Sequence, residues 1–139
     1  MTVPMVGEQT VLQYLLNSST KHLKVRLSKN PLPALLTGVV LTDLVECDFD
    51  GYASILDPPF DLITDTDTGI AEGLSFPLVW TAGLAITPQM ITGMYTTLQD
   101  GSGPELLFDV QRVGLGYLMN TPGQTFGRKL RMLVANRAT

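Results

Sequence analysis

The feature that most constrains this chain is a Gly-rich turn between two β-prone runs in its second half. The run Ile91–Gln99 is rich in Thr and Tyr and contains no Pro, and the run Pro104–Arg112 follows the tetrapeptide Asp100-Gly-Ser-Gly103. Asp-Gly between two such runs is a strong signal for a β-hairpin, because Gly adopts the positive φ that a tight turn needs. The chain is therefore expected to be rich in β-structure.

Other segments extend this pattern. Leu23, Val25 and Leu27 alternate with polar residues, as in a half-buried strand, and the alternation from Leu74 through Phe76 and Leu78 to Trp80 predicts another. Pro77 suggests that this second strand lies at an edge or ends there. The remaining expectations are a turn at Phe49–Tyr52 leading into a strand through Leu56, an exposed loop over 61–69, a turn at Gly114–Gly116, and short strands at Tyr117–Met119 and Leu130–Val134.

One segment near the start has the pattern of a helix. Within Gly7–Asn17, apolar residues recur at helical spacing (Val11, Leu12, Leu15, Leu16), and Glu8 in the first turn complements the helix dipole. We therefore predict one domain spanning 1–139. It would be mainly β, a small antiparallel β-sandwich or partly closed barrel with one N-terminal helix, in which Met1–Val6 forms an extended arm if it contacts a neighbour.

The chain carries few charges. Asp, Glu, Lys and Arg make up 16% of its 139 residues, whereas about 25% is typical. Either uncharged polar residues cover the surface, or part of the surface is buried against other chains. We favour the second reading, which predicts self-association or binding to another protein.

The charge and the hydropathy pattern of the chain disfavour two classes of partner. The net charge is −4 and the pI is near 4.7, whereas non-specific nucleic-acid binding needs a basic patch. The cluster Arg128-Lys129 with Arg131 is interpreted as a solvated strand face, or as an edge whose charges block stray pairing. No apolar run approaches the roughly 18 residues that span a bilayer, and no signal-peptide pattern is evident. We expect neither nucleic acid nor membrane as a partner.

The residues of nucleophilic or zinc catalysis are almost missing. His22 is the only histidine and Cys47 the only cysteine. A Ser-His-Asp or Cys-His system would have to use His22 as its base, and a zinc site needs several close His or Cys ligands, which the chain does not supply. We expect His22 at a strand end and Cys47 as a small buried residue. Trp80 and Tyr95 are interpreted as core aromatics, with a ligand platform as the alternative. We assign no catalytic, cofactor-binding or metal residue.

An acidic stretch offers one further possibility. Asp57, Asp61, Asp65, Asp67 and Glu72 follow one another closely, and Asp65–Gly69 begins like a calcium-binding loop. It lacks the later Gly and the bidentate Glu at the required distance. We therefore interpret 57–72 as an exposed acidic loop, with a weak divalent-cation site as the alternative, and expect no cofactor.

Several short motifs also follow one another in a recognisable order. The Leu-rich helix over 11–17 and the strand 23–27 precede Leu41–Glu46 and Phe49-Asp-Gly-Tyr-Ala53; later come Val79–Gly83, Ile91–Thr96, the hairpin and Leu106-Leu-Phe108. This order resembles a family of small virion-associated proteins of tailed bacteriophages. Members carry an L…L…E…F-x-G-Y-A block, then a G-Y-Y strand, a Gly-rich turn and an L-L-F/W strand. Here Gly93-Met-Tyr95 stands in place of the consecutive tyrosines, and the tail beyond Gly123 is basic.

The resemblance implies a non-enzymatic structural protein located in the virion. A capsid decoration (cement) protein that binds the major capsid protein is our leading hypothesis, because such a protein needs many modest contacts repeated by symmetry. The alternatives are a tail, baseplate or fibre-associated virion protein, and a small ligand- or carbohydrate-binding module that uses Trp80 and Tyr95.

Overall fold

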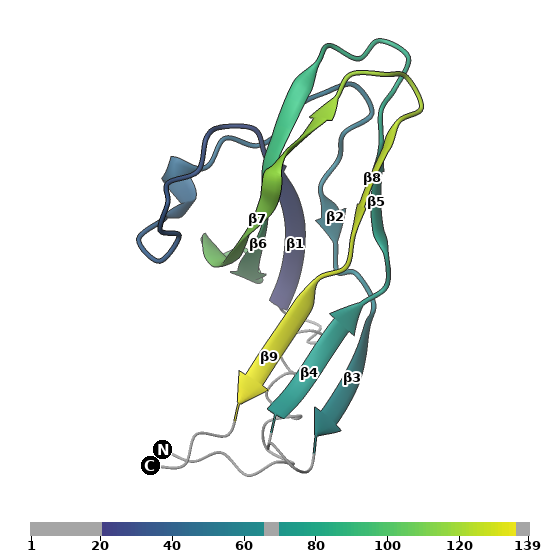
Figure 1. The fold of residues 1–139 in the computed structure, drawn as a ribbon. Helices are drawn as coiled ribbons and strands as arrows, with labels where there is room; N and C mark the ends of the chain where they lie inside the picture. The colour runs from purple at the N-terminus through teal and green to yellow at the C-terminus, as the bar shows by residue number, and fades with distance from the viewer. Residues whose placement is uncertain (1–20, 66–69, 136–139) are drawn as a thin grey trace.

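The computed structural model describes residues 21–65 and 70–135, and within these ranges the chain is mainly β (Figure 1). The strands are β1 (Lys21–Ser28), β2 (Ile55–Leu56), β3 (Phe60–Asp65), β4 (Ile70–Ser75), β5 (Leu78–Thr81), β6 (Gln89–Asp100), β7 (Glu105–Met119), β8 (Thr125–Arg128) and β9 (Arg131–Ala135); a short 3₁₀ helix, η1, spans Leu41–Asp43.

These strands form three antiparallel sheets that do not close into a barrel. The largest sheet has the order β2-β1-β6-β7, the second the order β3-β4-β9, and β5 pairs with β8. The hairpin of β6 and β7 confirms the first prediction from the sequence: Gln99 pairs with Glu105 beside the turn, and Gly101 takes a φ of 57° there. Because the three sheets do not close, the barrel alternative is wrong.

A common core joins the largest sheet to the β5–β8 pair. Leu23, Val25 and Leu27 project from β1 into this core, as their alternation predicts, and Trp80 and Phe126 enter it from β5 and β8. Figure 1 shows β5 and β8 facing β1, β6 and β7 across this core, while β3, β4 and β9 continue beyond it at one end of the molecule. Apolar burial between the layers is the main force that holds them together.

The prediction of an exposed loop over 61–69 is wrong for the first part of that segment. Residues 60–65 form β3, which pairs antiparallel with β4 from Phe60↔Ser75 to Asp65↔Ile70. β3 is an edge strand of its sheet, and an edge strand tolerates acidic residues because its outer side is solvated. Residues 66–69 lie outside the described ranges.

Two further boundaries differ from those expected. β4 ends at Ser75 and β5 begins at Leu78, so the alternating run belongs to two sheets, and Phe76 between them is exposed rather than buried. The predicted turn at Gly114–Gly116 is a bend within β7, which continues to Met119. The predicted helix at Gly7–Asn17 and the predicted arm at Met1–Val6 both lie outside the described residues.

Candidate interaction surface

A bulge in β7 carries the most exposed apolar side chain of the described chain. Ile91 pairs with Tyr117 and Gly93 with Arg112, so the single residue Thr92 lies opposite four residues of β7. Within the bulge, Leu115 has a relative exposure of 106%. A β-bulge of this kind redirects side chains away from the plane of the sheet, and here it directs a leucine into solvent.

Two glycines shape this bulge. Gly114 and Gly116 have φ values of 37° and 98°, which lie in the region that favours glycine. A Cβ at Gly116 would also lie 2.8 Å from the sulfur of Met90, so this position is restricted both by its backbone and by its neighbour. The exposed position of Leu115 is therefore built into the backbone on both sides.

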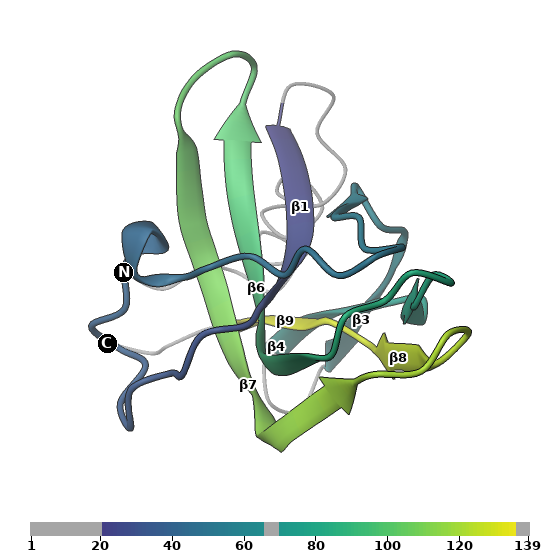
Figure 2. The same ribbon diagram turned by 90° about the horizontal axis from the view of Figure 1, so that it is seen from above.

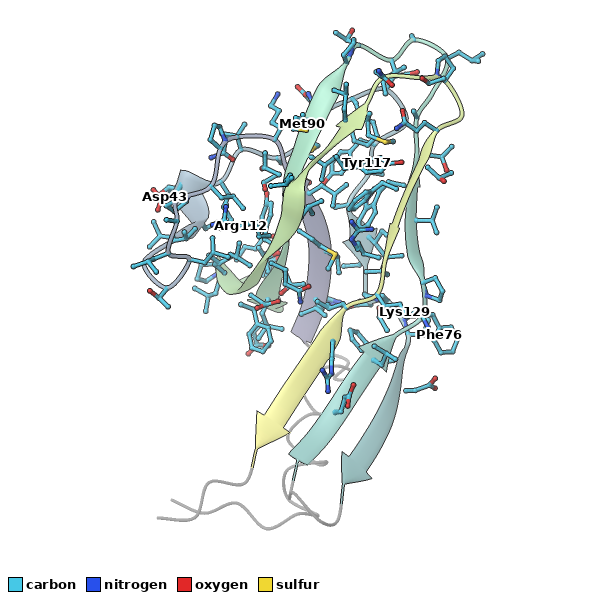
Figure 3. The ribbon with its side chains drawn as sticks, viewed as in Figure 1. Asp43, Phe76, Met90, Arg112, Tyr117 and Lys129 are labelled. Atoms are coloured by element: carbon cyan, nitrogen blue, oxygen red, sulfur yellow. The ribbon has the colours of Figure 1, made fainter. Side chains whose placement is uncertain are left out.

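The bulge adjoins further exposed apolar side chains. Met90 and Leu118 are cross-strand partners on β6 and β7, and each is more than two-fifths exposed. Figure 3 shows Tyr117 pointing toward β8 while Met90 lies on the other side of the ribbon. We call Met90, Leu115 and Leu118 the bulge patch. Leu106 and Phe108 extend the exposed apolar character to the opposite end of β7.

A polar cluster lies on the same sheet. The guanidinium of Arg26 on β1 donates to Glu105 on β7 from Nη2 (2.5 Å) and Nε (3.1 Å), and to Glu46 from Nη1 (2.8 Å). Thr97 on β6 donates to Glu105, and the Tyr52 hydroxyl donates to Glu46 over 2.6 Å. One cation thus joins two strands of the sheet to the segment that precedes β2.

The electrostatics of this cluster keep its ion pairs charged. Burial acts to lower the pKa of Arg26, but the hydrogen bonds to Glu105 and Glu46 outweigh it and raise the pKa above its ordinary value. Burial acts to raise the pKa of Glu105, and the hydrogen bonds from Thr97 and Arg26 reverse this, so that the pKa is lowered. A carboxylate held ionised by a shared guanidinium is a poor proton donor near neutral pH, and the arrangement suits a structural clamp.

His22 lies near the beginning of β1, as expected. Its Nδ1 is 2.8 Å from Oδ2 of Asp57, and both side chains are partly exposed. The other carboxylate oxygen of Asp57 accepts a hydrogen bond from the backbone N–H of Leu23 over 2.9 Å. Asp57 also has a φ of 47°, the one positive value among the described non-glycine residues. The pair fastens the chain after β2 to β1, and in the described part of the chain no hydroxyl or thiol nucleophile is hydrogen-bonded to His22.

Cys47 is buried, as predicted. Its side chain is only 2% exposed, and burial raises the pKa of its thiol to about 12. Because the thiolate is the reactive form of cysteine, this residue is chemically inert near neutral pH.

Trp80 and Tyr95 are core aromatics rather than a platform. Each is 3% exposed, and the Trp80 indole N–H donates to the carbonyl of Ala53 over 2.9 Å. Burial raises the pKa of Tyr95 to about 12. Neither ring is available to stack against a ligand.

The acidic stretch is dispersed by the fold. Asp57 binds His22 and Leu23, Asp65 ends β3, and Glu72 accepts from Arg131 over 2.7 Å. Most of the calcium-like motif Asp65–Gly69 lies outside the described ranges. Within those ranges, no group of three or more His, Cys, Asp or Glu residues is placed to hold a metal ion.

Sequence reasoning missed the two features that matter most here. The partners Arg26 and Glu105 are 79 residues apart, and no local pattern links them. The signal for the bulge was visible as Gly-Leu-Gly, but such a tripeptide equally predicts a turn. What distinguishes the two is the pairing of β6 on both sides of the bulge, which is a tertiary property.

No helix in the described part of the chain is long and apolar enough to cross a membrane. Comparisons with protein-family models, with curated proteins and with solved structures find no match to this chain.

Proposed function

We propose that this protein is a non-enzymatic structural component of a bacteriophage particle, and specifically a capsid decoration protein that binds the major capsid protein and stabilises the shell. The observation that carries the proposal is the bulge patch. A small monomer seldom exposes clustered apolar side chains unless they contact a partner, and here two glycines hold Leu115 fully outside the sheet.

The polar groups also support a non-enzymatic role. In the described chain, Arg26 is paired with both Glu46 and Glu105, and Cys47 is buried with a raised pKa. These groups are used in holding segments together rather than presented to a substrate. The order of motifs that resembles virion-associated proteins supports the phage assignment.

The fold fits many weak contacts better than one deep site. We infer that the largest sheet and the β5–β8 pair act as a small β-sandwich, a rigid support for apolar side chains along β7. A lattice repeats each modest contact many times, so a small patch on every copy can together stabilise the whole shell.

A tail, baseplate or fibre-associated role uses the same surface and remains the alternative within the virion. The binding-module alternative has less support, because Trp80 and Tyr95 are buried. Replacing Trp80 by Ala separates core and platform roles: we expect loss of the cooperative unfolding transition, whereas a platform residue would leave the fold intact.

The proposal is tested by the copy number of this chain per purified phage particle, measured by quantitative mass spectrometry against the major capsid protein. A fixed, near-stoichiometric ratio to the shell protein is the expected result. A small fraction of the shell count would move the protein to the tail or baseplate. Absence from particles would overturn the virion proposal.

A further inference from the structure

A groove lies beside the outer edge of β7. One wall contains Leu36, Thr37 and Val39, the other is the consecutive run Leu107–Val110, and the volume between them is about 340 Å³. Figure 2 shows β7 as the outermost of the long strands, with the segment around η1 standing beside it. Arg112 donates to the carbonyl of Pro33 and ties that segment to the strand; Figure 3 shows Arg112 between β7 and η1.

The edge of β7 itself forms one side of this groove. Thr96 pairs with Asp109 and Thr97 with Leu107, so Phe108 is an extra residue in β7, and such a bulge allows consecutive residues of an outermost strand to line one hollow. Among the described residues, β7 pairs with β6 alone, and no backbone hydrogen bond joins its other edge to another segment. Unpaired N–H and C=O groups of this kind are a template for an added strand.

The groove combines apolar side chains with polar backbone groups of the strand edge, which suits an extended segment with apolar side chains. Leu36, Val39, Leu107, Phe108 and Val110 supply apolar side chains, and Asp109 is the one charged residue in the lining. The segment around η1 occupies the space next to the strand edge, so the groove admits a single extended peptide more readily than the edge of a second folded sheet.

We propose that this groove receives Met1–Val6 of a second copy of the chain as an added strand, an inference that rests on the proposed role in a lattice. The first charged residue of the sequence is Glu8, and Val3, Met5 and Val6 offer apolar side chains. Pro4 lacks an N–H, which an outermost strand tolerates.

The length of chain before β1 allows the contact. Twenty residues precede Lys21; with 7–17 as the predicted helix at ~1.5 Å per residue and the rest extended at ~3.3 Å per residue, they span roughly 45 Å, which allows Met1–Val6 to reach a neighbouring copy. Each copy then offers one arm and one groove, so the contact is head-to-tail and propagates from copy to copy. The contact buries charge-poor surface, in agreement with the reading of the composition that we favour.

Two variants of the full chain separate the arm from the groove. Deletion of residues 2–6 removes the arm, and Phe108→Asp places a charge in the groove. Phe76→Asp is the matched control, because Phe76 is similarly exposed but lies between β4 and β5, outside the groove. Sedimentation velocity over a concentration series measures association of each purified protein.

We expect the parent and Phe76→Asp to associate, and both the deletion and Phe108→Asp to associate at least tenfold more weakly. Mixing the two defective variants should restore a one-to-one complex, because one supplies an intact groove and the other an intact arm. A labelled peptide of residues 1–6 should bind the deletion variant and not Phe108→Asp.

Three results would overturn the inference. Undiminished association of the deletion variant would place the contact elsewhere, and a mixture that stays monomeric would show that the arm does not enter the groove. A monomeric parent whose deletion variant binds the peptide would make the arm's own molecule the occupant. None of these results changes the copy number in particles, so the virion proposal is judged separately.

Discussion

Arg26 on β1 and Glu105 on β7 form an ion pair across the strand that separates them, with 2.5 Å between Nη2 and Oε1. β6 lies between the two strands and contributes Thr97, which donates to the same carboxylate. Both charged side chains are largely shielded, with side-chain exposures of 17% and 26%. Removing one member therefore leaves its partner charged in a poorly solvated position.

The first prediction is that Glu105→Gln lowers the free energy of unfolding. The substitution keeps the shape of the side chain but removes the negative charge of the carboxylate to which Arg26 and Thr97 donate hydrogen bonds. Hydrogen bonds to charged groups contribute about 1.5–3 kcal/mol, and we expect a loss in that range from urea denaturation at pH 7.

The control for Glu105→Gln is Asp48→Asn. Asp48 also pairs with a cation, Lys29, over 2.8 Å, but it is largely exposed, and exposed pairs contribute little. A loss for Glu105→Gln no larger than that for Asp48→Asn would show that the shielded pair across the sheet contributes no more to the free energy of unfolding than an exposed pair.

The second prediction concerns acid. The pKa of Glu105 is lowered in the folded protein from its ordinary value of 4.5, so the stability it contributes is complete above that value and is lost as pH falls through the folded pKa. The difference in unfolding free energy between the parent and Glu105→Gln should be constant from pH 7 to about 5.5 and should shrink below pH 4.5.

Denaturant titrations of both proteins at half-unit pH steps measure this difference. Asp48, whose pKa is also lowered, is present in both proteins, so its contribution to the pH dependence of stability cancels in the difference. A difference that stays constant to pH 3, or grows on acidification, would contradict the assignment of Glu105 as the titrating group.

The sequence predicts those elements whose signals are local. β1 follows from the alternation of Leu23, Val25 and Leu27, and the β6–β7 hairpin follows from Asp-Gly between β-prone runs. The burial of Trp80 follows from its place in an apolar alternation. In each case neighbouring residues along the chain carry the information.

The errors arise where pairing at a distance decides. Asp61 and Asp65 make the segment 60–65 resemble an exposed loop, yet it forms β3 because β4 pairs with it. The glycines of the β7 bulge would suit a turn, but β6 pairs on both sides of them and keeps the strand continuous. The Arg26 cluster joins β1, β7 and Glu46 only after the sheet has formed, so no motif in the sequence could indicate it.

The third prediction tests the bulge patch. Leu115→Asp should leave the unfolding free energy within about 0.5 kcal/mol of the parent, because substitutions of exposed residues rarely matter for stability. It should weaken retention on purified particles at least tenfold in a co-sedimentation assay. Leu84→Asp is the matched control, since Leu84 is 92% exposed but lies between β5 and β6, away from the bulge.

Equal retention of Leu115→Asp and Leu84→Asp would remove the bulge patch from the binding surface. Loss of retention in both would indicate that acidic charge anywhere on this protein weakens binding, and the patch would again carry no specific role.

The last prediction compares two adjacent threonines of β6. Thr96 and Thr97 are both buried, but their side chains belong to opposite faces of the strand. The Thr97 hydroxyl donates to Glu105, whereas the Thr96 hydroxyl has no hydrogen-bond partner among the described residues. A buried hydroxyl without a partner costs about 1–3 kcal/mol, and valine has nearly the same shape without that polar atom.

Thr96→Val should therefore raise the free energy of unfolding, and Thr97→Val should lower it because Glu105 loses a donor. Urea denaturation of both variants measures the two changes, which differ only in which face of one strand loses its hydroxyl. Changes of the same sign would mean that β-propensity, and not the hydrogen bonding of each hydroxyl, determines the effect.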